Sequence, residues 1–511
     1  YRTAALKATP CPARSSDKWM YYWTIANASG GNAGLHTDQS KNVVQWSTDA
    51  DASKWAFIEV TLTEEEIDAA RGGQQEFEDL VTKLPELQQH LTQLFSDWAC
   101  TALRPNIQAL SDDALAANED YAALTDAMKA MVLKVKNNTW QTFTLKNSDY
   151  TADYEKFFRI ADYKIYSNYT EMSNPQNFTM AYSFGRLSGP TGIVANPNDI
   201  IYIYVDEPAK EECSLAVEVV GTDGVAGNHA TGSQISLKQG VNVIRPAQQS
   251  LLYIFHQLNN TKKYLADYPD IRIHIEGGQL NGYWDATRGM TNKDWKLLQQ
   301  DLLKAPFVNL KTERLIFQMD RDLLLAAEPN EMEGLMRIWD KIVENEESYM
   351  GIEDFEGRYR NIWNAFSGAS SYMHASTYGT WYSEGTISTV MNYEKMRQPG
   401  NIWGPSHEIG HNHQGSINIC GTTESSNNLF SNINVFEQGI QTTRCFLPSD
   451  NFNALAEGKT WVLRDIWNTT RMFFQLYLYF HGMHHDDQFL PNLFRALRKN
   501  PIEKRSGWDS T

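Results

Sequence analysis

Residues 403–415 carry the pattern whose residue types and spacing can do chemistry. They include His407, Glu408 and His411 in the order His-Glu-x-x-His. On a helix, residues four apart project from one face, so the two imidazoles can share a tetrahedral zinc ion. The Glu408 carboxylate, next to the first histidine, can accept a proton from a water that the metal activates. The pattern therefore predicts a zinc site that hydrolyses a carbonyl compound, with Glu408 as the general base.

A catalytic zinc needs a third protein ligand and one open position. Glu424 follows His411 after Gly415 and Gly421, which leaves room for the chain to turn and present a carboxylate from a second helix. Asn428 lies one turn further on the same predicted face and can hold the outer nitrogen of a ligand imidazole. Glu437, which lies further along the chain, is the rival third ligand, and the nearer Glu424 is favoured.

The other histidines have simpler interpretations. His413 lies about 200° round the predicted helix from His411, so we expect it away from the metal. His256 and His374 stand among apolar and aromatic residues, as satisfied core histidines do. A further cluster can bind a metal but is more typical of a solvated helix end; it consists of His481, His484, His485, Asp486 and Asp487.

Aromatic residues surround a stretch just before the motif. Residues 386–391 alternate as an edge strand does, and such a strand can pair with extended substrate beside a metal helix. Nearby rings can stack on a ligand, and a tyrosine hydroxyl can stabilise an oxyanion. Packing in the core is the simpler interpretation of each single ring. The candidate substrate-binding residues are Trp381, Tyr382, Tyr393 and Trp403.

Four predicted segments position this motif, and together they indicate a multidomain α+β fold. Residues 1–62 mix aromatic residues with turn formers and are typical of a β-rich module. Residues 63–140 show helical spacing and form a helical region. Residues 141–280 contain short strands of period two without helices between them, which favours a β-sandwich accessory domain. Residues 281–511 return to helical periodicity and form a mainly helical catalytic domain.

Several elements inside these segments are predicted individually. Leucines at helical spacing predict a helix over 80–94, in which Pro85 marks a kink or boundary. A second helix is predicted over 114–136, and a long C-terminal helix over 463–480. The strands predicted for the sandwich are 200–205, 215–219, 241–244, 251–255 and 271–275.

The composition of the 511 residues excludes some classes of protein. Asp and Glu number 62 against 45 Lys and Arg, a net charge of −17, so no basic footprint for nucleic acid exists. No run approaches the ~18 apolar residues of a membrane span. The five cysteines are too sparse for a disulfide framework, and a Cys420–Cys445 bridge is the pairing considered. Aromatic residues, at 12%, serve as core or as contact surface.

The motif and its surroundings resemble a known family. Residues 403–414, with Glu424 and the pair 427–428, resemble the enhancin-like metallopeptidases, the sixtieth metallopeptidase family, which includes viral enhancins and bacterial mucin-degrading enzymes. Residues 271–284 resemble the junction between the family's β-sandwich and its catalytic domain, and 189–193 the start of the sandwich. The resemblance covers roughly residues 180–500.

The resemblance implies a gluzincin arrangement, in which His407, His411 and Glu424 bind zinc and Glu408 is the general base. It implies hydrolysis of peptide bonds in mucin-type O-glycosylated proteins, with the glycan as part of the recognition, by a secreted or surface-attached protein. Members of the family usually continue past the position of Thr511, so the catalytic domain is expected to extend beyond this sequence.

Two alternatives stay open. One is a gluzincin peptidase without a glycan requirement. The other is a carbohydrate-binding or adhesion protein in which the metal domain is subsidiary. The intact set of His407, Glu408, His411 and Glu424 argues against an inactive metal domain.

Overall fold

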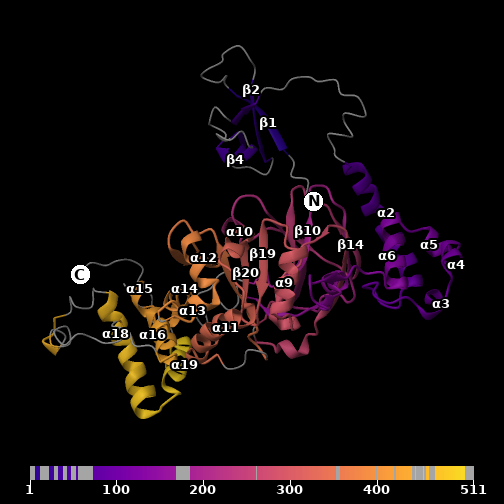
Figure 1. Cartoon of the computed structure of the whole chain (residues 1–511). Helices are drawn as coiled ribbons and strands as arrows, with labels where there is room; N and C mark the ends of the chain where they lie inside the picture. The colour runs from indigo at the N-terminus through magenta and orange to yellow at the C-terminus, as the bar shows by residue number, and fades with distance from the viewer. Residues whose placement is uncertain are drawn as a thin grey trace. The chain divides into compact units, whose positions relative to one another are not determined.

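A computed structural model describes residues 6–11, 22–27, 33–37, 43–47, 53–55, 73–168, 185–260, 262–352, 357–398, 400–418, 422–439, 444, 453, 456–459 and 466–500. The chain divides into two compact units, Tyr1–Gln75 and Glu76–Thr511 (Figure 1). Within the described ranges, no helix has the length and apolar character that a membrane crossing requires.

The first unit contains one sheet. Its strands β1 to β4 follow one another in chain order, and the short β5 pairs antiparallel with β2. The module predicted for residues 1–62 therefore does contain strands. The strands are β1 Leu6–Cys11, β2 Tyr22–Asn27, β3 Ala33–Thr37, β4 Val43–Ser47 and β5 Lys54–Trp55.

The helical region begins with α2, Gln74–Leu94. This helix runs on through Pro85, so the predicted boundary there is wrong. An interior proline costs about 3 kcal/mol, and burial of one leucine-rich face offsets this cost. Leu87, Leu91 and Leu94 of that face are buried in a cluster that also includes residues of α6, Asp126–Asn137, and two tyrosines of the following sheet.

The single helix predicted over 114–136 is also wrong, because three helices occupy these residues. They are α4 Asp112–Ala116, α5 Glu119–Ala122 and α6; the short α3, Pro105–Gln108, precedes them. Ser111, Asn118 and Thr125 each accept a hydrogen bond from the backbone N–H three residues later. Such N-caps start a new helix, and three of them in close succession divide the segment.

Two sheets, antiparallel except for the short parallel pairing of β9 with β15, enclose a shared apolar core in the next segment. One sheet has the order β13-β12-β15-β10-β17, with β9 paired to β15, and the other the order β14-β11-β16-β8. Apolar side chains of β10, β12 and β15 meet those of β11, β14 and β16 in one buried cluster. All five predicted strands lie within these sheets. The strands are β8 Ile160–Tyr163, β9 Tyr166–Ser167, β10 Gly189–Ala195, β11 Ile201–Val205, β12 Cys213–Gly221, β13 Ser233–Ser236, β14 Gly240–Ile244, β15 Ser250–Leu258, β16 Ile271–Glu276 and β17 Gln279–Leu280.

A further six-stranded sheet, which the sequence interpretation missed, supports the helices that follow residue 281. Its order is β18-β19-β20-β21-β23-β22, so β22 is an edge strand. β19 and β20 are buried throughout apart from the last residue of β20, and they lack the polar alternation that would have marked them as strands. The strands are β18 Trp284–Asp285, β19 Phe307–Lys311, β20 Leu315–Asp320, β21 Trp363–Ser367, β22 Met373–Ser376 and β23 Gly379–Tyr382.

Helices pack around this sheet, and α14 and α16 lie side by side in the orange part of the chain (Figure 1). The edge strand predicted over 386–391 is wrong, because α12 occupies it. Thr386, Ile387 and Val390 are its buried residues. This spacing lies on one helix face, whereas the adjacent Thr386 and Ile387 would point to opposite faces of a strand. The helices are α9 Asn292–Asp301, α10 Arg321–Ala326, α11 Met332–Tyr349, α12 Glu384–Val390, α13 Tyr393–Met396, α14 Trp403–His413, α15 Thr423–Ser426, α16 Asn428–Glu437, α18 Ile466–Tyr477 with the π-helix Leu478–Met483, and α19 Phe489–Lys499.

Asp340 of α11 makes the stability of this domain depend on pH. Burial raises the pKa of its carboxyl from 3.8 to about 6, against the hydrogen bonds that it accepts from Thr312 and Arg314. The folded state therefore holds the proton more tightly than the unfolded state, and the free energy of unfolding falls as pH rises from about 4 to 6. The penalty reaches about 2–3 kcal/mol above pH 6.

We therefore expect Asp340→Asn to raise the free energy of unfolding by about 2–3 kcal/mol at pH 8. The amide oxygen can still accept from Thr312 and Arg314, so the native bonds stay. The gain should shrink as pH is lowered and disappear near pH 4. Denaturant unfolding of both proteins across this range measures it, and a gain that is the same at every pH would contradict the assignment to this carboxyl.

Candidate metal centre

Two helices and the short α15 bring the motif residues together. His407, Glu408 and His411 lie on α14, and Glu424 lies on α15, which α16 follows directly. Gly410 permits this close approach, because a Cβ at that position would lie 2.9 Å from the backbone oxygen of Asn427. A side chain there would separate α14 from the turn that carries the third candidate ligand.

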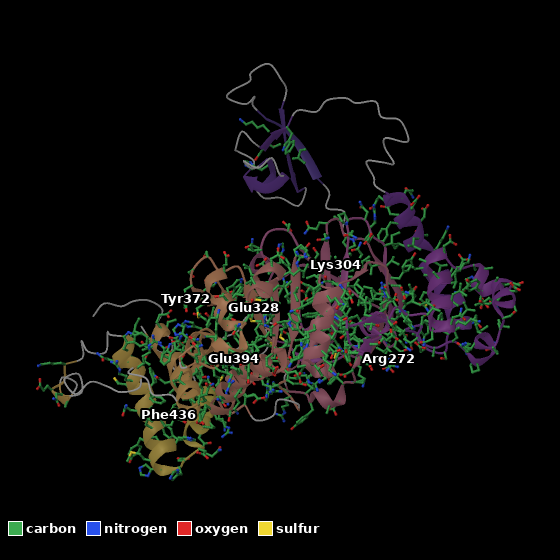
Figure 2. The ribbon with its side chains drawn as sticks, in the orientation of Figure 1. Arg272, Lys304, Glu328, Tyr372, Glu394 and Phe436 are labelled. Atoms are coloured by element: carbon green, nitrogen blue, oxygen red, sulfur yellow. The ribbon has the colours of Figure 1, made fainter. Side chains whose placement is uncertain are left out.

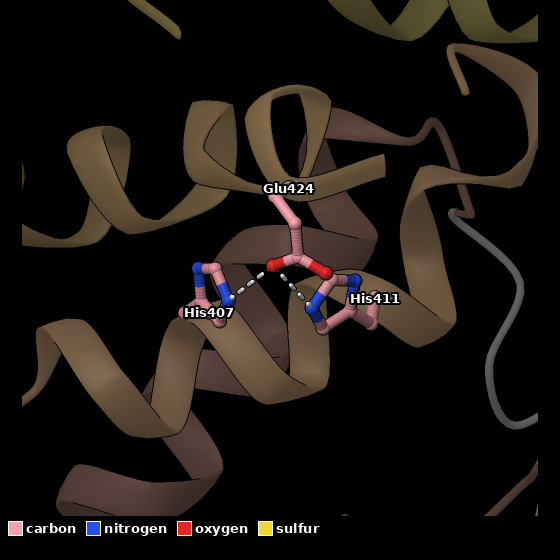
Figure 3. Close-up of side chains that lie close together, drawn as sticks. All are labelled: His407, His411 and Glu424. Carbon is pink, nitrogen blue, oxygen red and sulfur yellow. Dashed lines mark ion pairs between the residues drawn. The ribbon is translucent and has the colours of Figure 1, made fainter. Parts of the chain in front are cut away.

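The ligand-capable atoms of His407, His411 and Glu424 converge on one point (Figure 3). Glu424 Oε2 lies 3.3 Å from His407 Nε2 and 3.4 Å from His411 Nε2. A tetrahedral zinc with bonds of about 2.0–2.1 Å places its ligand atoms about 3.4 Å apart. Two imidazoles and one carboxylate at these separations therefore fit zinc. No other cluster of three such groups occurs in the described part of the chain.

The outer nitrogen of His407 has a partner that sets its tautomer. His407 Nδ1 lies 2.7 Å from Asn428 Oδ1, and the Asn428 amide donates to the backbone oxygen of Glu424 at 2.8 Å. An oxygen acceptor places the ring proton on Nδ1 and leaves the Nε2 lone pair for a metal. Asn428 thus occupies the position predicted for it and links two of the converging residues.

His411 has a comparable partner in Gln414, which the sequence interpretation missed. The Gln414 side-chain amide lies 2.9 Å from His411 Nδ1 and 2.8 Å from the Ser426 hydroxyl. The two ends of an amide are exchangeable by rotation. In the structure the Gln414 NH₂ faces His411 Nδ1, and its oxygen accepts from the Ser426 hydroxyl. The reverse orientation, with the oxygen on His411 Nδ1, would leave the Nε2 lone pair for a metal; the Asn427 amide nitrogen lies 3.1 Å from that Nε2. Gln414 lies on the helical turn that adjoins His411, and this spacing could have identified it from the sequence.

Electrostatics distinguishes the two glutamates. Hydrogen bonds from His407 and His411 hold the pKa of Glu424 far below its usual range, although burial opposes this. Burial raises the pKa of Glu408, with His407 and His411 opposing and Glu424 adding to the shift. Glu408 is only 5% exposed, whereas the Glu424 side chain is 56% exposed. The two carboxyls therefore shift in opposite directions: Glu424 releases its proton more readily than a free glutamate, and Glu408 holds its proton more tightly.

The face of α14 opposite the converging residues is tied to α11 and α16 by buried hydrogen bonds. Glu346 Oε1 accepts from the Ser406 hydroxyl at 2.7 Å, and Glu346 Oε2 lies 2.7 Å from His413 Nδ1. Asn434 of α16 donates to Ser406 at 2.7 Å and to Glu346 at 3.2 Å. Burial raises the pKa of Glu346 and lowers that of His413 to about 3, so the pair is neutral.

The sequence interpretation also missed Glu346, although the sequence pattern of α11 could have identified it. The apolar stripe of α11 contains Trp339, Ile342 and Val343, and the next position on the same face is Glu346. A carboxylate on an apolar stripe needs a buried partner, and His413 is that partner. His413 lies away from the converging residues, as expected from its position on the helix.

The four candidate substrate-binding residues lie in different environments. Tyr382 is fully buried and packs edge-on against Trp339. The Trp381 ring stacks between Phe366 and His374, and its indole N–H donates to the backbone of Gly227. These contacts favour a packing role for both rings and leave their predicted roles untested.

The other two candidates, Trp403 and Tyr393, lie at the starts of helices α14 and α13. Trp403 begins α14 one turn before His407, and the Arg444 guanidinium lies 4.6 Å from its ring centroid. Tyr393 is partly buried at the start of α13, with the Arg397 guanidinium 5.2 Å from its ring. Trp403 is therefore the ring that shares a helix face with His407.

Other residues that the sequence analysis considered lie elsewhere. Glu437 accepts hydrogen bonds from Tyr349 and Tyr477 and does not join the converging group. His481 pairs with Asp487 at 2.8 Å and lies 3.7 Å from Glu437, so this cluster is internally bonded. The Cys420–Cys445 pairing that the sequence analysis considered lies outside the described residues.

The edge strand β22 lies beside α14. A Cβ on Gly404 would come within 2.6 Å of the Met373 sulfur, so Met373 packs directly against the first turn of α14. Tyr372, just before the strand, is 72% exposed (Figure 2). The strand beside the motif helix is thus Met373–Ser376, which lies upstream of the predicted position.

Comparison with known sequences finds a family and a more distant relative. Residues 288–510 match the family described as peptidase M60, enhancin and enhancin-like. TRPM8 channel-associated factor 2 of Homo sapiens is 30% identical over 142 residues, which are 27% of this chain and 15% of that protein. The alignment therefore covers only a small part of this relative.

Two solved structures share the fold over most of the chain. A metallopeptidase from Bacteroides thetaiotaomicron superposes with a TM-score of 0.69 at 26% identity, covering 81% of this chain and 68% of the other. A metallopeptidase in complex with Tn antigen superposes with a TM-score of 0.60 at 29% identity, covering 68% of this chain and 65% of the other. Both matches extend well beyond the short motif from which the resemblance was first drawn.

Proposed function

We propose, from the premise that residues 288–510 belong to the enhancin-like M60 metallopeptidases, that the chain is a zinc endopeptidase. Its substrates are mucin-type O-glycosylated proteins, and it acts in a secreted or surface-attached form. The observation that carries the proposal is the convergence of His407, His411 and Glu424 at separations of 3.3 and 3.4 Å, which suit tetrahedral zinc.

In this proposal His407 Nε2, His411 Nε2 and one Glu424 oxygen hold the metal. Zinc bound there supplies a Lewis acid for the peptide carbonyl and a lowered pKa for a water molecule. Asn428 holds His407 in the tautomer that leaves its Nε2 for the metal, and Gln414 would do the same for His411 with its amide oxygen turned toward Nδ1. Glu408 takes up the proton of the attacking water on its carboxylate and passes it to the leaving amine.

Glu408 suits this role because its carboxylate has no hydrogen-bonding partner among the described residues, so both oxygens can accept a proton. It is buried yet stands on the same helix as both histidines, directly after the first of them. A base in a poorly solvated position transfers protons with little solvent rearrangement.

The peptide backbone of the substrate is proposed to pair with β22. An edge strand presents unpaired N–H and C=O groups, to which an extended segment can add as a further strand. β22 is the last strand of its sheet and packs on the first turn of α14. An added peptide strand would therefore run beside α14. Tyr372 and Trp403 could then contact the side chains or the glycan of that peptide.

The glycan requirement rests on a relative that was solved with Tn antigen. We expect a peptide that carries one O-linked N-acetylgalactosamine to be cleaved faster than the same peptide without it, by at least about tenfold, because a bound sugar helps to fix the reacting peptide bond. Mass spectrometry of the two digestions, with zinc content measured on the same sample, provides the test. Equal cleavage rates would favour a gluzincin peptidase without a glycan requirement.

A non-enzymatic role is the alternative from another class. One relative is named as a channel-associated factor rather than as a peptidase. Under this alternative the β-rich segments would bind carbohydrate or protein, and the metal domain would be subsidiary. Absence of hydrolysis in a zinc-loaded protein, on both glycosylated and plain peptides, would favour it.

A further inference from the structure

A hollow of about 200 Å³ opens at a place separate from the metal-centre residues. Its walls come from two segments: Tyr150, Tyr154 and Phe157, around the start of helix α7 (Tyr154–Arg159), and Arg288 to Asp294, which lead into α9. Pockets for drug-sized ligands enclose about 300–1,000 Å³. The smaller volume of this hollow therefore suits a ligand with a single ring.

The aromatic walls are held in fixed positions. The hydroxyls of Tyr150 and Tyr154 both donate to Asp294 Oδ1. Asp294 is 6% exposed, and its other oxygen accepts from the backbone and hydroxyl of Thr291. The carboxylate thus orients two rings and caps α9, so the hollow exists before any ligand enters.

The guanidinium of Arg288 forms the polar part of the wall. It lies 3.3 Å from the centroid of the Phe157 ring and donates to the Phe157 backbone oxygen. No carboxylate among the described residues lies within ion-pair distance of it. The guanidinium has five N–H donors, so it retains donors for a ligand. An arginine stacked on a ring in this way is rigid and loses little entropy on binding.

Acceptors complement these donors on the other side of the hollow. Asp153 lines the rim, where one of its carboxylate oxygens caps α7 and the other can accept from a ligand, and the two tyrosine oxygens can accept as well. Arg288 and Asp153 carry opposite charges, and so do Asp294 and its neighbour Lys293, whose ammonium lies 5.7 Å from the Tyr150 ring. The charges around the hollow nearly balance, which disfavours a strongly charged ligand.

We propose that this hollow binds one neutral sugar ring of a glycan. A pyranose has apolar C–H faces that pack on aromatic rings, and hydroxyl edges that both donate and accept hydrogen bonds. The lining of the hollow offers aromatic rings, guanidinium donors, and carboxylate and phenol acceptors. The site goes beyond the proposed peptidase function, because it needs neither the metal nor hydrolysis, and it would anchor a glycoprotein at a second place.

Gly289 offers a variant that blocks the hollow without removing any of its walls. Its φ of +76° is tolerated by Asn, and a Cβ there meets nothing within 4 Å. Gly289 lines the hollow, so Gly289→Asn adds a polar side chain to its lining. Gly439→Asn is the matched control, since Gly439 has a φ of +71°, an equally open surrounding, and lies outside the hollow.

The test is a ligand-observed NMR titration of the full chain with galactose, glucose, N-acetylgalactosamine and N-acetylglucosamine. We expect saturable binding of at least one of them, weakened at least tenfold by Gly289→Asn and by Arg288→Lys, and unchanged in Gly439→Asn. Absence of saturable binding for all four sugars, or binding that survives Gly289→Asn, would overturn the proposal. So would binding of sodium acetate or of N-acetylphenylalaninamide in place of the sugars. Peptide hydrolysis does not enter the measurement, so failure here and failure of the peptidase function are distinguishable.

Discussion

Replacing Glu408 with Gln is expected to lower kcat by about 10²- to 10⁴-fold, the usual contribution of a general base. Gln has nearly the same size as Glu but cannot accept the proton of the attacking water. His407, His411 and Glu424 are untouched, so zinc content should stay at that of the parent protein. Initial rates on a defined glycopeptide, together with metal analysis of the same samples, measure both quantities.

Glu394→Gln is the matched control for this substitution. Glu394 lies on α13, where its side chain is 76% exposed and pairs only with Arg397 among the described residues, so we expect unchanged activity. If the Glu408→Gln protein retained zinc and full activity, the assignment of Glu408 as general base would be wrong. If it lost zinc, the lower rate would have to be assigned to the metal site and not to proton transfer.

Loss of a residue that only hydrogen-bonds a zinc ligand weakens zinc binding by ~10- to 100-fold. We expect Glu424→Gln, which replaces a candidate ligand itself, to weaken zinc binding by more than this. The charge of Glu424 is held by the two histidines, which keep its pKa far below the usual range. A neutral amide removes the anionic member of the three candidate ligands. Competition with a chelator gives the dissociation constant, and hydrolysis measured without added zinc should fall in parallel.

The Glu437→Gln variant tests which of the two candidate carboxylates, Glu424 or Glu437, is the third zinc ligand. Glu437 accepts hydrogen bonds from Tyr349 and Tyr477 and is absent from the converging group. Its substitution should therefore leave zinc affinity unchanged. The opposite result, with zinc lost from the Glu437 variant and kept by the Glu424 variant, would reverse the assignment of the third ligand.

The resemblance to enhancin-like peptidases could be drawn from the sequence because the motif is local. His407, Glu408 and His411 lie within little more than one helical turn, so their common helix face follows from helix geometry alone, and the family match confirms the resemblance. The positions of Asn428 and Glu424 also follow from short-range spacing. The strands of the two sheets formed by β8 to β17 were visible as short runs rich in Ile, Val, Leu and Tyr between turn formers, although most of them are buried almost throughout.

Other features depend on contacts between distant segments. β19 and β20 are buried on both faces, and such strands lack a period by which they can be recognised. The residue types over 386–391 alternate as in a strand, but these residues fold as α12, whose buried positions lie on one helix face and which packs against α10 and α13. Glu346 lies far before the motif in the sequence, and no local rule connects an acidic residue of α11 with Ser406 and His413.

The bonds of Glu346 with Ser406 and His413 have a consequence for how the centre is assembled. They hold α14 against α11 on the side away from His407 and His411, and Asn434 adds α16 to the same group. The helix that carries the histidines is thus fixed by interactions in which no ion takes part. In small zinc-dependent domains the ion drives folding. Because the bonds of Glu346 need no ion, we expect α14 to keep its position, and the protein to stay folded, when the metal is removed.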